Sequence, residues 1–182
     1  MARTTFQGPV RSLGGLYQQG PNAVVAITAS TTLNPVSHGG RILTVGGSLA
    51  ANLTITLPAI NTSANPSSSG PGQDPNTLNN EGVVYTIWVP TTISTSSLKI
   101  GTTSGSSDLF LGTIFGVDTD TSNALVAYTA NGSSNDFINF NGGTTGGVAG
   151  TWVQIFALAA NKYMVNGVAL GTGTVATPFA DS

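Results

Sequence analysis

Short runs of apolar residues, separated by polar and glycine-rich segments, recur roughly every ten residues along the chain. The runs are rich in β-branched and aromatic side chains, and each is bounded by Gly, Ser, Asn or Pro, as strands are. This spacing predicts an all-β fold: a single antiparallel β-sandwich or barrel, jelly-roll-like, with an extended N-terminal arm. The runs are Ile42–Val45, Leu53–Leu57, Val83–Val89, Leu98–Ile100, Leu109–Leu111, Leu125–Thr129, Phe137–Phe140, Trp152–Leu158 and Lys162–Asn166.

Alternation is clearest in the run Leu53–Leu57, where every second residue is apolar and the residues between are threonines. A strand of this kind is buried on one face only. Near the C-terminus, the connection Ala159–Asn161 between the last two runs is short enough to predict a tight antiparallel hairpin. Three Asn-Gly pairs predict turns at strand ends, because both residue types tolerate positive φ. They are Asn131–Gly132, Asn141–Gly142 and Asn166–Gly167.

Both tryptophans, Trp88 and Trp152, lie in the middle of apolar runs. Aromatic side chains in such surroundings usually pack in a core. We therefore expect both in the core, in preference to a platform on which a sugar ring stacks.

Two segments lack the strand pattern and define the domain organisation. Residues 1–22 contain apolar side chains but are interrupted by Gly-Pro and Gly-Gly pairs, which predicts an extended arm that docks on another surface. Residues 23–182 form the predicted β-sandwich domain. Within it, residues 61–80 contain three prolines and one large apolar residue, Leu78, and should form a long polar loop. We expect this loop to be exposed and to tolerate insertion.

The chain is unusually poor in charge. Its 182 residues include 7 acidic and 5 basic side chains, so charged residues make up 7 %, against about 25 % in ordinary globular proteins. The hydrophobic share of 40 % is ordinary, which favours a folded core over disorder. A net charge of −2 provides no basic face for nucleic acid. Apolar stretches such as Ala23–Ile27 are far shorter than the roughly 20 residues that cross a membrane, so we expect a soluble chain without an export signal.

Candidate catalytic and metal-binding residues are few. The chain has no cysteine, and its one histidine, His38, has no motif that links it to a carboxylate. Asp118 and Asp120 begin a D-x-D-x-S pattern resembling a calcium loop, but Asn123 and Thr129 stand where that loop needs Gly and Glu. We therefore expect a polar turn there and His38 in a surface turn or subunit contact. The sequence predicts no enzyme, no cofactor and no metal site.

Six segments point to a known family: Gly8–Ser12, Leu53–Pro58, Val83–Val89, Trp152–Leu158, Lys162–Val165 and Gly171–Phe179. Together they resemble the virion structural proteins of marine tailed phages, especially cyanophages. The resemblance implies a non-enzymatic protein of the capsid decoration, or cement, type. Such a protein binds the major capsid protein lattice of an HK97-type icosahedral shell as a symmetric oligomer. It would be assembled in the host cytoplasm and lie on the outer surface of the capsid.

Within this hypothesis the arm is the expected anchor, to the capsid or between subunits. It combines two arginines with aromatic and aliphatic side chains, as interface hot spots do, and no acidic residue precedes Asp74. A homotrimer is the expected working unit and a dimer the second choice, because several arms together bind avidly. The loop at 61–80 would then point away from the shell. The expected interface residues are Arg3, Phe6, Pro9, Val10, Arg11, Leu13, Leu16 and Tyr17.

Four alternatives stay open at this point. The arm residues Phe6 and Leu16 could instead cover the protein's own sandwich. The chain could be a tail or head-fibre module that binds host-surface glycans. It could also be a generic carbohydrate-binding β-sandwich. An enzyme acting on polysaccharides could assemble two carboxylates from distant positions.

Overall fold

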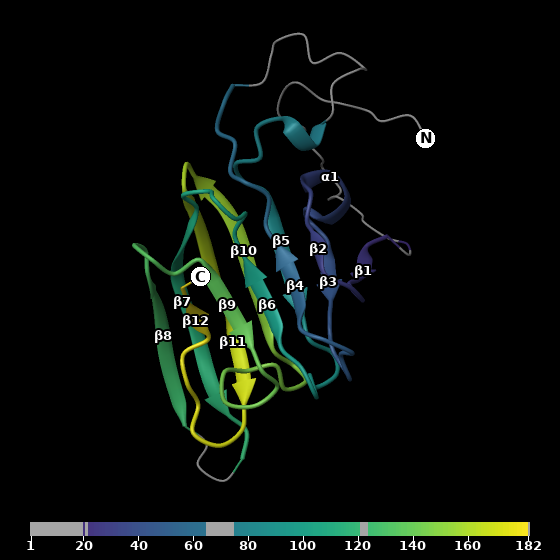
Figure 1. The fold of residues 1–182 in the computed structure, drawn as a ribbon, viewed down its shortest axis with the longest axis vertical. Coiled ribbons are helices and arrows are strands. Elements are labelled where there is room, and N and C mark those ends of the chain that lie inside the picture. Colours follow the sequence, from purple (N-terminus) through teal and green to yellow (C-terminus); the bar gives the residue numbers. More distant parts are fainter. Residues whose placement is uncertain (1–19, 21, 65–74, 121–123, 182) are drawn as a thin grey trace, which may run out of the picture.

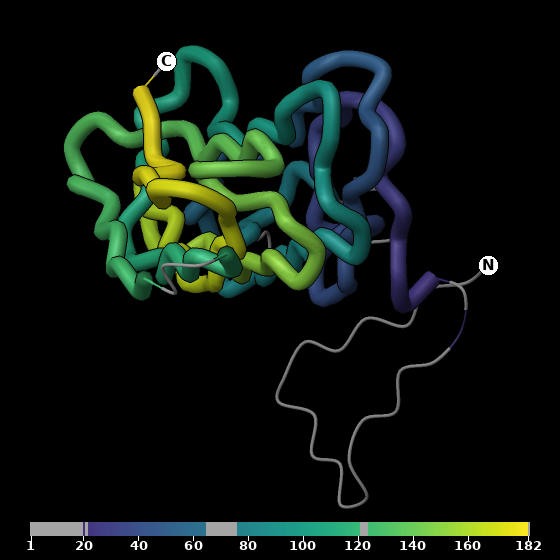
Figure 2. The backbone as a smooth tube through the Cα atoms, turned by 90° about the horizontal axis from the view of Figure 1, so that it is seen from below, coloured from purple at the N-terminus to yellow at the C-terminus, as the bar shows by residue number. Residues whose placement is uncertain are grey.

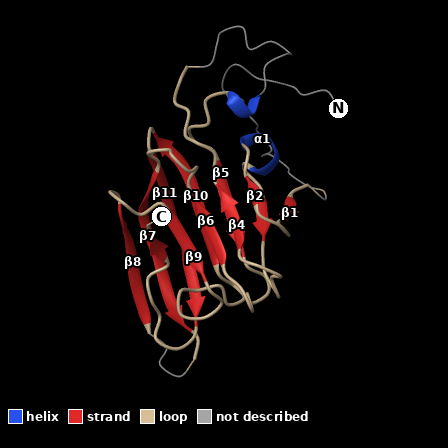
Figure 3. Ribbon diagram, in the orientation of Figure 1, coloured by secondary structure: helices blue, strands red, loops and turns tan. Residues whose placement is uncertain are grey.

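The structure is a computed structural model, and it describes residues 20, 22–64, 75–120 and 124–181. Strands make up 45 % of the chain and helices 4 %, and the strands form two sheets packed face to face (Figures 1 and 3). The predicted all-β sandwich is confirmed.

Sheet A contains seven strands and sheet B five, with two short helical segments beside them. In spatial order, sheet A consists of β1 (Val24–Ala26), β3 (Ile42–Thr44), β5 (Val84–Trp88), β10 (Trp152–Ala159), β11 (Lys162–Gly171), β7 (Leu109–Asp118) and β8 (Leu125–Asn131). Sheet B consists of β12 (Phe179–Ala180), β9 (Phe137–Phe140), β6 (Leu98–Gly101), β4 (Leu53–Thr56) and β2 (Thr31–Thr32). The helical segments are α1 (Pro35–His38) and η1 (Pro75–Thr77).

The sheets are mixed, so the expectation of an antiparallel, jelly-roll-like arrangement was wrong. From β1 to β6 the chain alternates between the sheets, and each strand from β3 onward lies parallel to the strand two before it in the strand order. Parallel neighbours require a crossover connection, and here each crossover passes through the opposite sheet. The N-terminal half is therefore a short coil of strands that winds from one sheet to the other and back. It is coloured purple to teal at one end of the sandwich in Figure 2.

The C-terminal half is built mainly from antiparallel pairs. The predicted hairpin is confirmed: β10 and β11 pair from Trp152 and Val168 to Ala159 and Lys162, with a bulge between Ala157 and Ala159. Asn161 supplies the positive φ, 61°, that the tight connection needs. On its other side β11 pairs with β7, and this pairing is parallel along ten residues of each strand.

One of the three Asn-Gly pairs does not mark a corner. Gly132 and Gly142 have positive φ at strand ends as expected, whereas Gly167 lies in the middle of β11. A Cβ atom at Gly167 would stand 2.4 Å from the backbone oxygen of Trp152 on β10. Glycine is needed there for the close approach of two strands rather than for a turn.

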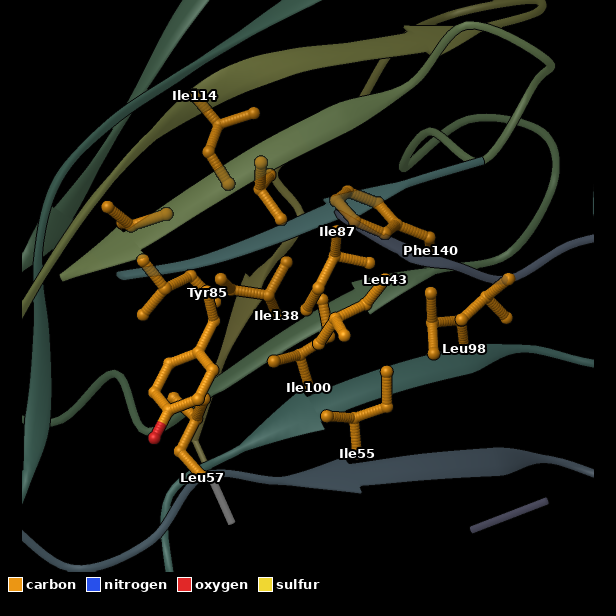
Figure 4. Close-up of a cluster of buried hydrophobic side chains, with 14 of the residues drawn as sticks. Leu43, Ile55, Leu57, Tyr85, Ile87, Leu98, Ile100, Ile114, Ile138 and Phe140 are labelled. Atoms are coloured by element: carbon orange, nitrogen blue, oxygen red, sulfur yellow. The ribbon is translucent and has the colours of Figure 1, made fainter. Parts of the chain in front are cut away.

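The core fills the space between the sheets. Figure 4 shows side chains from both sheets interdigitating, among them Leu43 and Ile87 of sheet A and Ile55, Ile100 and Phe140 of sheet B. The predicted alternation in β4 is confirmed, because Leu53, Ile55 and Leu57 are buried whereas Thr54 and Thr56 are only half-buried.

Adjacent residues of β3 provide a matched test of this packing. Leu43 is fully buried and Ile42 is 43 % exposed. We expect Leu43→Ala to lower the free energy of unfolding by about 2–5 kcal/mol, and Ile42→Ala by about 1 kcal/mol or less. Urea unfolding followed by circular dichroism measures both. Equal losses would contradict the inward orientation of Leu43.

Candidate functional site

The outer side of sheet A is an apolar surface. Trp88 is 43 % exposed, and Trp152, its direct partner on β10, also points outward. The expectation that both tryptophans lie in the core was therefore wrong. Their neighbours Ile87, Val89 and Val153 occupy the inward positions instead. Val83–Val89 carries large apolar side chains on both faces of the strand. Its sequence therefore does not indicate whether the odd-numbered or the even-numbered residues face the opposite sheet.

The register aligns the outward side chains in rows that cross the sheet. The row with both tryptophans is mostly apolar and contains Ala26, Thr44, Trp88, Trp152, Val168, Phe115 and Ala127. The next row is mainly polar but uncharged, and contains Val24, Ile42, Thr86, Gln154, Asn166, Thr113 and Thr129. A third row, again mainly apolar, contains Val84, Phe156, Met164, Leu111 and Asn131. Leu170, Val117 and Leu125 lie beyond the tryptophan row, on the side away from the polar row. We call the three rows, together with these three residues, the outer face of sheet A.

Most exposed large apolar side chains of the described chain gather on this face. Six of the eight belong to it, among them Phe115 at 45 % and Leu125 at 67 % exposure. Leu158 lies at the bulge beside it, and Val126 is on the inner side. Leu111, Phe115 and Leu125 were not predicted from the sequence to be surface residues. The available signal was the run Leu109–Leu111, because consecutive apolar residues on a strand place one of them outside.

The outer side of sheet B is different in character. Its central row consists of Thr54, Lys99 and Asn139. Beside this row the Lys99 ammonium lies 5.7 Å from the centre of the Phe137 ring, a cation–π contact that covers the aromatic ring. The sandwich therefore has one apolar and one polar outer side.

His38 does not belong to either face. It is the last residue of α1, and its Nδ1 accepts a hydrogen bond from the backbone N–H of Asn34 at 3.0 Å. Burial lowers the pKa of His38; the backbone of Asn34 raises it in part, and the positive charge of Arg41 lowers it. Burial and Arg41 favour the neutral imidazole, whose Nδ1 accepts the Asn34 hydrogen bond.

Asp118 and Asp120 organise the end of β7. Asp118 is only 2 % exposed, and its Oδ1 accepts a hydrogen bond from the backbone N–H of Asp120 at 3.0 Å. Asp120 in turn accepts from the backbone N–H of Gly173 at 2.6 Å, which ties the turn to the segment after β11. Across the described ranges, no group of three or more His, Cys, Asp or Glu side chains is placed to hold a metal ion.

A cavity of about 460 Å³ opens at the end of the N-terminal coil. It is lined by the β1–β2 connection, residues 27–30, and by the segment before β4, residues 46 and 48–53. Ile27, Leu49 and Leu53 provide the apolar part of the wall, and none of the lining residues is ionisable. The cavity can accommodate an apolar or neutral polar group.

The base of the long loop is closed by a buried polar clamp. Asn80 is 3 % exposed; its Oδ1 accepts from the backbone N–H of Asn61, and its Nδ2 donates to the backbone oxygen of Ala59, both at 2.9 Å. The buried carboxylate of Asp108 accepts from the N–H of Ile60. Beside the clamp, Tyr163 donates its hydroxyl hydrogen to the oxygen of Pro58.

Burial raises the pKa of Tyr163, and the nearby Tyr85 and Asp108 raise that pKa further. Burial also raises the pKa of Tyr85. Both tyrosine hydroxyls therefore stay protonated in the neutral pH range, so Tyr163 can donate to the oxygen of Pro58 throughout it.

The predicted interface residues Arg3, Phe6, Pro9, Val10, Arg11, Leu13, Leu16 and Tyr17 all lie outside the described residues, as does the tip of the loop, 65–74. The structure describes the base of the loop, where Asn76 of η1 accepts a hydrogen bond from the backbone N–H of Val36 in α1.

Comparisons with family models, with curated proteins and with solved structures find no match to this chain. Among the described residues, no helix has the length and apolar character needed to span a membrane.

The clamp can be tested by comparing two neighbouring asparagines. We expect Asn80→Ala to lower the free energy of unfolding by about 2–4 kcal/mol, because it leaves the N–H of Asn61 and the oxygen of Ala59 without their partner inside the protein. Asn79→Ala, which removes hydrogen bonds to Glu81 at the surface, should cost about 1 kcal/mol or less. Chemical unfolding of both variants measures the difference, and a small loss for Asn80→Ala would rule out a structural clamp.

Proposed function

We propose that this chain is a non-enzymatic structural protein of a tailed-phage virion. In this role it decorates and stabilises the icosahedral capsid by binding the lattice of the major capsid protein. The observation that carries the proposal is the one-sided sandwich, with an uncharged aromatic face on sheet A and a polar face on sheet B. An exposed apolar face of this breadth is typical of a protein whose working state is an assembly.

The shortage of charge supports the same role. Burying an ion without a partner costs several kcal/mol, whereas Thr, Asn and Gln lose less on desolvation and can pair with many groups. The only charged residue at an outward position of the sheet A strands is Lys162, whose Nζ donates to the oxygen of Gly132 at 2.7 Å. An interface built on this face needs no matching charge on its partner.

The resemblance to marine phage virion proteins specifies the assembly. It supports a place on the outside of the capsid as a symmetric oligomer, with the N-terminal arm at 1–22 as the anchor. Arg3 and Arg11 can each form bidentate contacts with a carboxylate on the shell.

The proposal is tested by binding to capsids that lack this protein. The full chain should co-sediment with the shells, in hundreds of copies per particle. Deleting residues 2–20 should abolish binding while the circular dichroism spectrum is kept. Arg11→Ala should weaken binding by about 1–3 kcal/mol if its contact is desolvated, and Arg41→Ala, which alters a basic residue outside the arm, should not. Failure of the full chain to bind would overturn the proposal, and a few tens of copies would indicate a tail or vertex part.

One observation favours a second function, that of a head-fibre or tail module that binds glycans. Trp88 and Trp152 are cross-strand partners on the surface, and Thr86 and Gln154 in the adjacent row provide hydrogen-bonding groups beside them. Stacked sugar rings with polar groups at their edges are bound in this way. Titration with host-surface polysaccharide should change the tryptophan emission, and Trp152→Ala should lower the affinity about tenfold, equivalent to about 1.4 kcal/mol. Unchanged emission at saturating polysaccharide would exclude this function.

A further inference from the structure

We infer that the outer face of sheet A is an interface with a second copy of this chain, packed face to face. The inference rests on the proposed function in one respect, namely that the protein works as an assembly. It adds which surface joins the copies, and it favours a pair over the trimer expected from the sequence.

The composition of the face points to an identical partner. A partner of opposite charge would require charged groups on this face. The only charged residue at an outward position of the seven strands is Lys162, at the start of β11. The uncharged polar row lies between two mainly apolar rows, and Gln154 and Asn166 in it each carry both a donor and an acceptor. When two copies pack face to face, the hydrogen-bond donors of one polar row can therefore pair with the acceptors of the other. This makes the face self-complementary.

The size of the face fits a stable pair. Seven strands about 4.8 Å apart span roughly 29 Å, and the outward residues of β11 from Lys162 to Leu170 span roughly 26 Å. The resulting area of roughly 700 Å² for each copy is close to the ~800 Å² that each partner contributes to a standard stable interface.

The chemistry of the exposed side chains supports direct sheet-on-sheet packing. Sheets pack about 10 Å apart through interdigitating apolar side chains, as the inner faces of this sandwich already do. Trp88 and Phe115 belong to the residue types that contribute most to interface energy, and they lie in the same row on either side of Trp152 and Val168.

The mass of the full chain in solution tests the inference without any capsid. At tens of micromolar, light scattering should give twice the chain mass of 18.3 kDa. Phe115→Glu should give 18.3 kDa, because it places a carboxylate within the apolar row that contains both tryptophans. Leu125→Glu, at a side chain 67 % exposed and on an edge strand, should raise the dissociation constant at least tenfold without affecting folding. The matched control Thr54→Glu, on the outer side of sheet B, should remain a pair.

Chemical labelling locates the interface independently. The chain has no cysteine, so a single introduced cysteine is a unique probe. Asn166→Cys should be protected from a bulky maleimide at high protein concentration and should react after dilution, whereas Thr54→Cys should react at both concentrations.

A wild-type chain that sediments as a monomer, or as a trimer, would overturn the inference, as would a pair that survives both glutamate substitutions. These results are separable from the proposed function. A monomer that binds capsids contradicts only the interface, and a pair that fails to bind capsids contradicts only the capsid role.

Discussion

The two sheets hold each other together through the side chains that alternate toward the space between them, and the orientation of every other group depends on this packing. Sheet B has only one apolar side, because β4 and β6 carry aliphatic residues that alternate with Thr54 and Lys99. Sheet A is apolar on both sides along much of its length. Sheet B therefore determines which side of sheet A is buried, and a side with two mainly apolar rows of side chains remains exposed. The surface that we assign to assembly thus follows directly from the way the core forms.

Much of the fold is predictable from the sequence, for reasons that particular segments make clear. Leu53–Leu57 alternates strictly, so both the strand and its buried side were predicted correctly. In the last hairpin, Ala159–Asn161 is too short to permit anything other than an antiparallel return, and the structure agrees. In these segments the local sequence alone determines the structure. The strands β1, β2 and β12, with two or three residues each, are too short to show a pattern of their own.

The remaining features depend on contacts between distant segments. Packing against sheet B decides that Trp88 points outward. The parallel strand pairs are connected by crossovers of very different length. Val24 and Ile42 pair across a short crossover, whereas Ile42 and Thr86 pair across one that contains the long loop. No fixed period is therefore visible in the sequence, although the chain coils. Gly167 shows the same limit, because its role is set by the backbone of Trp152 on a neighbouring strand.

The candidate site was predictable only in its general character. The shortage of charge indicated neutral interfaces, but the interface residues chosen from the sequence, between Arg3 and Tyr17, lie outside the described residues. The clamp at Asn80 shows why polar residues are hard to interpret in sequence. Asn79 and Asn80 are adjacent and identical, yet Asn80 is 3 % exposed and its side chain bonds across the loop neck to the backbone of Ala59 and Asn61, whereas Asn79 bonds to Glu81.

Because of the coil of strands in the N-terminal half, strands can be added at the two ends of the sandwich in different ways. Each turn of the coil adds one strand to sheet A and one to sheet B, in the same direction as the strands before them. Duplication of a turn would thus lengthen both sheets together and preserve their facing cores. At the other end, a hairpin such as β7–β8 extends sheet A alone. The number of N-terminal turns can therefore change while the C-terminal hairpins, and with them most of the outer face of sheet A, stay the same.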